Sequence, residues 1–85
     1  MTELLEFPCE FPIKVMGPAE PGFEHLVTAI VRRFAPDLPE SAVSSRSSRN
    51  DRFLSVTVVL QASSRQQLDQ IYAALSSAPE VSVVL

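Results

Sequence analysis

His25 and Cys9 carry the most direct catalytic chemistry in this sequence, and each is the single example of its residue type. One histidine cannot complete a metal site or a catalytic triad, because both need further ligands or an orienting group. Cys9 has the acidic Glu10 beside it and no basic residue that would activate a thiol nucleophile. We therefore expect no catalytic residues, no metal and no cofactor, and the sequence does not indicate an enzyme.

Arginines recur at every third position in a second group, Arg46, Arg49 and Arg52. Guanidinium groups bind phosphates and carboxylates, so this group could form an anion-binding site. Alternatively, these charges protect the edge of a sheet against pairing with other chains. We favour the second interpretation, because charges commonly guard sheet edges and Asp51 offsets part of the cluster.

The segment 19–27 places an acidic residue and the pair Pro21-Gly22 before an apolar residue, Phe23. This arrangement resembles the loop at the start of ACT domains, which are regulatory modules that sense small molecules. The resemblance implies a ligand site at Gly17, Gly22 and Phe23, where a helix N-terminus would bind an amino acid or another carboxylate. Pro-Gly is also ordinary chemistry for starting a helix, so a purely structural role stays open.

Alternating apolar residues predict the strands that must position these groups. The first strand covers residues 11–16 and ends at a Gly-Pro pair. Residues 41–49 are polar and predict a weak edge strand, with a hairpin tip at residues 50–51. The β-branched segment 53–62 predicts a long central strand, and residues 81–85 predict a last one.

Two helices are predicted between these strands. Apolar residues in segment 23–34 recur with helical spacing and form one continuous stripe, which Pro36 closes. The second helix begins at Ser64, which with Gln67 has the form of a capping box, and it ends before Pro79.

The order strand, helix, strand, strand, helix, strand predicts an α+β, ferredoxin-like sandwich. We expect a four-stranded antiparallel sheet of order 4-1-3-2 with both helices on one face. The expected inward set is Phe11, Ile13, Val15, Leu54, Val56, Val58, Leu60, Val81 and Val83. The other face of the sheet would then offer a half-apolar interaction surface, on which Val84 also lies, with these principal members: Lys14, Met16, Ser55, Thr57 and Val59.

The length of 85 residues predicts a single domain over residues 1–85, with residues 1–10 as an N-terminal arm. The net charge of −3 disfavours nucleic acid and anionic membranes as partners. RNA recognition would also need aromatic residues on the central strands, where only Phe53 occurs. The single cysteine and the acidic N-terminus favour a cytoplasmic protein.

Five segments together resemble the YbeD-like family of small uncharacterised bacterial proteins. They are Leu4-Leu5-Glu6-Phe7-Pro8, Phe11 with Lys14-Val15-Met16-Gly17, Ala35-Pro36, Ser55-Val56-Thr57-Val58 and Val83-Val84-Leu85. The resemblance covers nearly the whole chain and implies an ACT-like fold and a bacterial origin. The chain departs from the family pattern in Pro21-Gly22 and in its arginine-bearing hairpin.

Two functional hypotheses follow from this sequence. The first is a non-enzymatic regulatory or interaction module that binds an unknown protein partner or a second copy of itself through the free face or the edges of its sheet. The second is a sensor of an amino acid or another small carboxylate at the Pro21-Gly22 turn.

Overall fold

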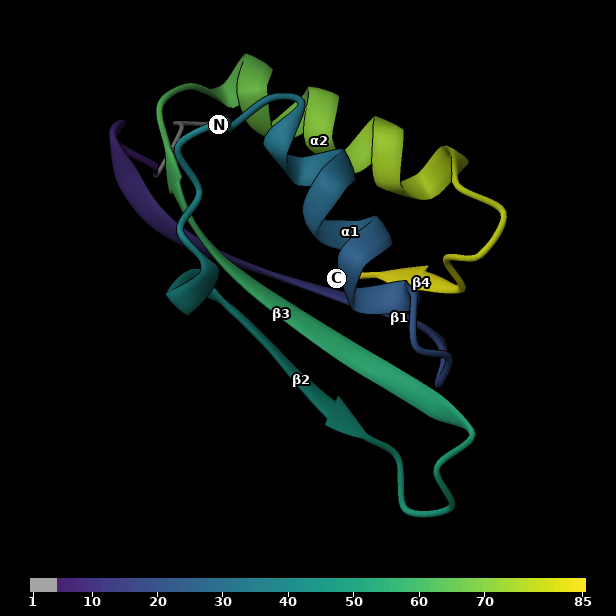
Figure 1. Cartoon of the computed structure of the whole chain (residues 1–85). Coiled ribbons are helices and arrows are strands. Elements are labelled where there is room, and N and C mark those ends of the chain that lie inside the picture. Colours follow the sequence, from purple (N-terminus) through teal and green to yellow (C-terminus); the bar gives the residue numbers. More distant parts are fainter. Residues whose placement is uncertain (1–4) are drawn as a thin grey trace.

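Two ten-residue strands, β1 (Cys9–Pro18) and β3 (Phe53–Ala62), form the centre of the sheet in the computed structural model, which describes residues 5–85 (Figure 1). They pair antiparallel without interruption, from Cys9 opposite Ala62 to Pro18 opposite Phe53. Alternation places every second residue of each strand under the helices, where the side chains of Ile13, Val15, Val56 and Val58 are fully buried. The two central strands therefore supply the floor of the core.

Two shorter strands lie at the edges of the sheet: β2 (Val43–Ser47) beside β3 and β4 (Val83–Val84) beside β1. The resulting order β2-β3-β1-β4 confirms the predicted 4-1-3-2 order. A single 3-10 turn, η1 (Glu40–Ala42), precedes β2. The hairpin between β2 and β3 turns at Asp51, whose φ of 57° is in the left-handed region that aspartate tolerates.

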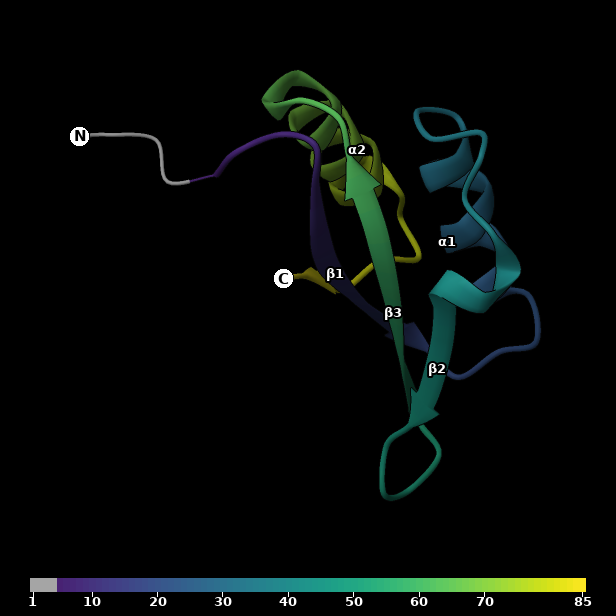
Figure 2. The same cartoon turned by 90° about the vertical axis from the view of Figure 1, so that its left-hand side faces the viewer.

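Both helices, α1 (Phe23–Arg32) and α2 (Arg65–Ser77), cover the same face of the sheet (Figures 1 and 2). The predicted stripe of α1 is confirmed, although the helix ends at Arg32 and the last apolar residue of the stripe, Phe34, follows it in a turn. Each helix turns apolar residues toward the strands, so they share one core with the sheet. The buried members are Phe23, Val27, Ile30, Val31, Leu68, Ile71 and Leu75.

The start of α2 is capped largely as the sequence predicts. The Ser64 hydroxyl accepts a hydrogen bond from the Gln67 backbone N–H at 3.0 Å. The Gln67 side-chain oxygen accepts from the backbone N–H of Ser63 at 2.8 Å, one residue before the expected position. Its amide nitrogen donates to the carbonyl of Phe34 at 2.8 Å, so one side chain ties α2 to the segment that follows α1.

The two ends of the chain differ from the prediction. Strand β1 begins at Cys9, so the last two residues of the predicted arm, Cys9 and Glu10, belong to the strand; residues 1–4 of the arm are outside the described residues. Strand β4 is limited to two residues, with Val84 opposite Val15 and Val83 opposite Met16. The expected inward position of Val83 is therefore wrong: Val84 faces the core and Val83 faces away, because a shift of one residue exchanges the two faces of a strand.

Candidate functional site

The predicted interaction residues lie on the side of the sheet opposite the helices. Residues directly opposite one another in an antiparallel pair point to the same face, so the register determines its members. We call this surface the outer face; it consists of Glu10, Pro12, Lys14, Met16, Pro18, Ser44, Arg46, Phe53, Ser55, Thr57, Val59, Gln61, Val83 and Leu85. The structure thus brings all five predicted interaction residues onto one surface.

Large hydrophobic side chains are exposed on the outer face. Within residues 5–85, the exposed ones are Phe53 at 55%, Val83 at 42% and Leu85 at 61%. Phe53 lies opposite Pro18, and Val83 lies opposite Met16. The backbone of Leu85 exchanges hydrogen bonds with Lys14 at 3.0 and 2.7 Å, which places its side chain on the same side. All three side chains therefore point away from the core on one face.

The outer face carries two cationic side chains among hydroxyl groups, one on a central strand and one on an edge strand. Lys14 lies opposite Thr57, and Arg46 lies opposite Ser55, and both cations are exposed. Among the residues that form the outer face, the one acidic side chain is Glu10, which lies near the end of β1 opposite Gln61. The side chains of this face are therefore suited to a partner that carries acidic groups.

The predicted ligand residues Gly17 and Phe23 are in direct contact. A Cβ atom at Gly17 would lie 2.3 Å from two ring carbons of Phe23 and 2.8 Å from the carbonyl oxygen of Glu80. Phe23 is 3% exposed, so its ring fills the space over the glycine. Gly22, in contrast, is exposed at the start of α1, with no neighbour within 4 Å of a Cβ built on it. Gly17 has a packing role, and ligand binding at this turn stays a prediction.

A shallow hollow beside the start of α1 is mainly acidic. Its lining includes Glu20, Glu24 and Glu40, with Arg32 as the strong cation, and the Ser45 hydroxyl donates a hydrogen bond to the Glu24 carboxylate. Three carboxylates and one guanidinium group in the same lining disfavour a further carboxylate from a ligand. Nothing in the lining therefore adds support to a carboxylate sensor.

The predicted arginine group is divided between two places. Arg46 belongs to β2 and lies on the outer face, whereas Arg49 and Arg52 belong to the hairpin that joins β2 to β3. All three are exposed, and β2 is an edge strand. This position agrees with protection of a sheet edge, and anion binding by the group stays a prediction.

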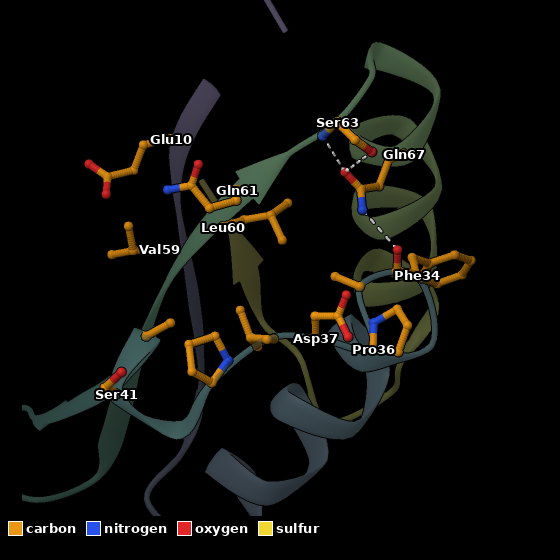
Figure 3. A pocket seen from close by; sticks show the side chains of 14 residues that line it. Glu10, Phe34, Pro36, Asp37, Ser41, Val59, Leu60, Gln61, Ser63 and Gln67 are labelled. Atoms are coloured by element: carbon orange, nitrogen blue, oxygen red, sulfur yellow. Dashed lines mark hydrogen bonds between the residues drawn. The ribbon is translucent and has the colours of Figure 1, made fainter. Parts of the chain in front are cut away.

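A second concave surface, which the sequence did not indicate, lies beside the far half of β3. We call it the edge groove; its volume is about 670 Å³ (Figure 3). Glu10, Val59, Leu60 and Gln61 lie along one side of it, and the segment after α1 lies along the other. The full lining is Glu10, Phe34, Ala35, Pro36, Asp37, Leu38, Pro39, Ser41, Ala42, Val59, Leu60, Gln61, Ser63 and Gln67.

Hydrogen bonds hold the second wall of the edge groove in place. The guanidinium group of Arg32 donates to the carbonyl of Leu38 at 3.2 and 3.0 Å. The side-chain amide of Gln67 donates to the carbonyl of Phe34, and the guanidinium carbon of Arg33 lies 5.4 Å from the centre of the Phe34 ring. The sequence signal for this wall is Pro36 with Pro39, because proline cannot donate a ladder hydrogen bond and so this segment cannot pair with β3 as a regular strand.

A family comparison identifies the chain. The family model described as a protein of unknown function, DUF493, matches residues 2–85. The chain belongs to this family. It is 48% identical to a UPF0250 protein of Nitrosomonas europaea over the full length of both chains. It is 49% identical to one of Chromobacterium violaceum, over 98% of this chain and 93% of that one. The expected membership of a family of small uncharacterised bacterial proteins is confirmed.

The DUF493 fold also occurs in a solved structure. The solution structure of protein HP0495 from H. pylori has a TM-score of 0.75 and 16% sequence identity, and the match covers 99% of this chain and 88% of that one. At this identity the likeness supports the α+β fold alone, with its four-stranded sheet and two helices. The family descriptions assign no activity.

Two searches of residues 5–85 limit the kinds of site that this part of the chain offers. No helix there has the length and apolar character needed to cross a membrane. No three His, Cys, Asp or Glu side chains in the same residues lie close enough together to hold a metal ion.

Proposed function

We propose that this DUF493 protein is a non-enzymatic module that binds another protein through its outer face. The observation that carries the proposal is that Phe53, Val83 and Leu85 are exposed together on one face of the sheet. Exposed apolar side chains that gather on one surface, with polar groups among them, are typical of protein interaction sites. Met16 and Val59 lie on the same face and are partly exposed.

The partner is a different protein with acidic groups in its contact surface. Lys14 lies on the central strand β1 and Arg46 on the edge strand β2, and the one acidic side chain of the face, Glu10, lies toward the end of β1. Two copies packed face to face would bring two cationic side chains from each copy together with one acidic side chain from each, which opposes a homodimer through this face. An acidic partner surface would instead complement both cations.

Composition supports a cytoplasmic, non-catalytic role. The chain has one cysteine, which gives no intramolecular disulfide, and one histidine. In the structure, Cys9 lies partly buried in β1 and His25 is exposed on α1, on separate elements. Cys9 lies opposite Ala62 at one end of the β1–β3 pair, whereas His25 lies beside the same hollow as Leu54 near the other end, so binding accounts for the surface better than a nucleophile and base pair does.

Affinity capture with matched variants tests this function. The purified chain is immobilised and exposed to lysate of its native bacterial host, beside the double variant F53S/V83S and the double variant K14E/R46E. The control is A73S on the exposed side of α2. The proposal expects one retained protein that both face variants lose and that A73S keeps.

Two results would refute the proposal. One is equal retention of the same protein by F53S/V83S and A73S, which would remove the outer face from the interaction. The other is light scattering that gives twice the chain mass for the wild type and the single chain mass for F53S/V83S, because the outer face would then bind a second copy.

A further inference from the structure

The edge groove lies against the edge of β3 and not over one face of the sheet. Its lining includes the three consecutive residues Val59, Leu60 and Gln61. Consecutive side chains of a strand point to opposite faces, so a concave surface that touches all three must follow the strand's edge. The pairing of β2 explains why this edge is open, since the register ends with Val43 opposite Val58.

Backbone groups of β3 are directed into this open stretch. At the other end of β3, Arg52 accepts a hydrogen bond from Ala19 on the β1 side, and Phe53 accepts one from Ser48 on the β2 side. The pairing of β1 with β3 continues without a bulge, so this alternation extends along the whole strand. The N–H and C=O of Gln61 therefore point away from β1, and among the described strands none pairs with Gln61 on that side.

The charged side chains that line the edge groove are all acidic. Of its fourteen lining residues, Glu10 and Asp37 are acidic and none is basic. The remaining lining is largely apolar and includes Leu60, Leu38 and Pro36. An occupant with a backbone to pair, apolar side chains and a positive charge would satisfy all three properties of this site.

We propose that the edge groove binds an extended peptide segment that carries lysine or arginine, and that this segment pairs with the edge of β3 at Gln61, between Val59, which faces Ala42, and Ser63, whose N–H is bonded to Gln67. Two residues that face each other in a hydrogen-bonded antiparallel pair exchange both of their bonds, so Gln61 offers one donor and one acceptor to the segment. The volume of about 670 Å³ is within the usual range of ligand sites. This binding surface goes beyond the outer face and the partner proposed for it.

Amide chemical shifts of the labelled full-length chain test the peptide site. The probe is a capped six-residue peptide that alternates valine and lysine. One matched control replaces lysine with glutamate, and a second is the valine–lysine peptide with methylated backbone nitrogens. The expected result is a shift of the Gln61 amide signal with the first peptide, and at least about tenfold weaker binding of both controls.

Variants of the chain separate the backbone from the charge contribution. Q61P removes the free N–H from β3, and we expect loss of binding, while Q61A keeps the N–H and binds within about twofold of wild type. E10Q/D37N should weaken the valine–lysine peptide about threefold or more, since two exposed ion pairs are removed. The wild-type comparison of the three peptides is decisive even if Q61P does not fold.

Three outcomes would overturn the peptide site. They are no shift with the valine–lysine peptide, equal binding of the methylated peptide, and equal shifts with free lysine, which would indicate a small-molecule site. F53S/V83S should bind the peptide like wild type, so failure of the outer face as an interaction surface and failure of the edge groove are distinguishable.

Discussion

Replacing Gly17 with alanine separates a packing glycine from a ligand-binding one. The backbone at Gly17 has no positive φ, so alanine is strained there only by space. Its Cβ would lie 2.3 Å from the ring of Phe23 and 2.8 Å from the carbonyl of Glu80, and neither neighbour is a flexible surface group. Overpacking of this kind costs roughly 1–3 kcal/mol, and two obstructed sides favour the upper half of that range.

Part of this loss in the free energy of unfolding is offset, because alanine has less conformational freedom than glycine in the unfolded chain. That effect returns about 0.4–1 kcal/mol, which leaves a net destabilisation of about 2 kcal/mol for G17A. In a domain of this length such a change lowers the melting temperature by roughly 8–16 °C. Urea unfolding followed by circular dichroism measures the free energy of unfolding, and a thermal scan checks the temperature shift.

Two further variants, G22A and F23L, test whether the cost of G17A comes from packing. A Cβ at Gly22 would have no neighbour within 4 Å, and the gain from the stiffer unfolded chain is offset because Gly22 is the N-cap of α1, where glycine is favoured over alanine; G22A should therefore change the free energy of unfolding by less than about 0.5 kcal/mol. F23L removes the two ring atoms that obstruct position 17, so G17A should cost less in that background than in the wild type. Stability of G17A equal to that of G22A would refute the packing role, as would the same cost for G17A with and without F23L.

Two further outcomes follow from single side chains. Q67A removes the hydrogen bonds to Ser63 and Phe34 and should lower the free energy of unfolding, measured in urea, by about 1–2 kcal/mol. The exposed control Q70A should stay near wild type. Equal effects of the two variants would contradict the role of Gln67 in joining α2 to the segment after α1. Burial raises the pKa of Tyr72 above its ordinary value of 10.0, so absorbance titration should show later ionisation in the folded chain than in urea. The resulting stability is complete below pH 10.0 and falls as pH rises through the folded pKa, and ionisation at the same pH in both states would contradict this.

Regular patterns made most of the fold predictable. The alternation in β3 and the spacing of α1 each match one kind of element, and strand length distinguished centre from edge. The inward face of the last strand was not predictable, because Val81, Val83 and Leu85 would point to one face of the sheet while the equally apolar Val84 would point to the other. Composition could not choose between the two, and the hydrogen bonds from β1 to residues 82 and 85 determined the register.

The candidate site was predictable only where it depends on strand alternation. Lys14, Met16 and Thr57 share a face because β1 and β3 are regular, and the sequence placed them there correctly. The contact of Phe23 with Gly17 depends on how the helix sits on the sheet, which the Pro-Gly signal does not encode. The edge groove depends on where β2 stops pairing, and single-residue propensities do not determine such an end.

Site-specific crosslinking in the native host tests the outer face as an interaction surface most directly. A photoreactive phenylalanine derivative is placed at Phe53 on the outer face and, in a second chain, at Ala73 on the exposed side of α2. The proposal expects one crosslinked protein from position 53 that is absent from position 73 and is lost when K14E/R46E is added. Equal crosslinking at both positions, or none at position 53, would contradict it.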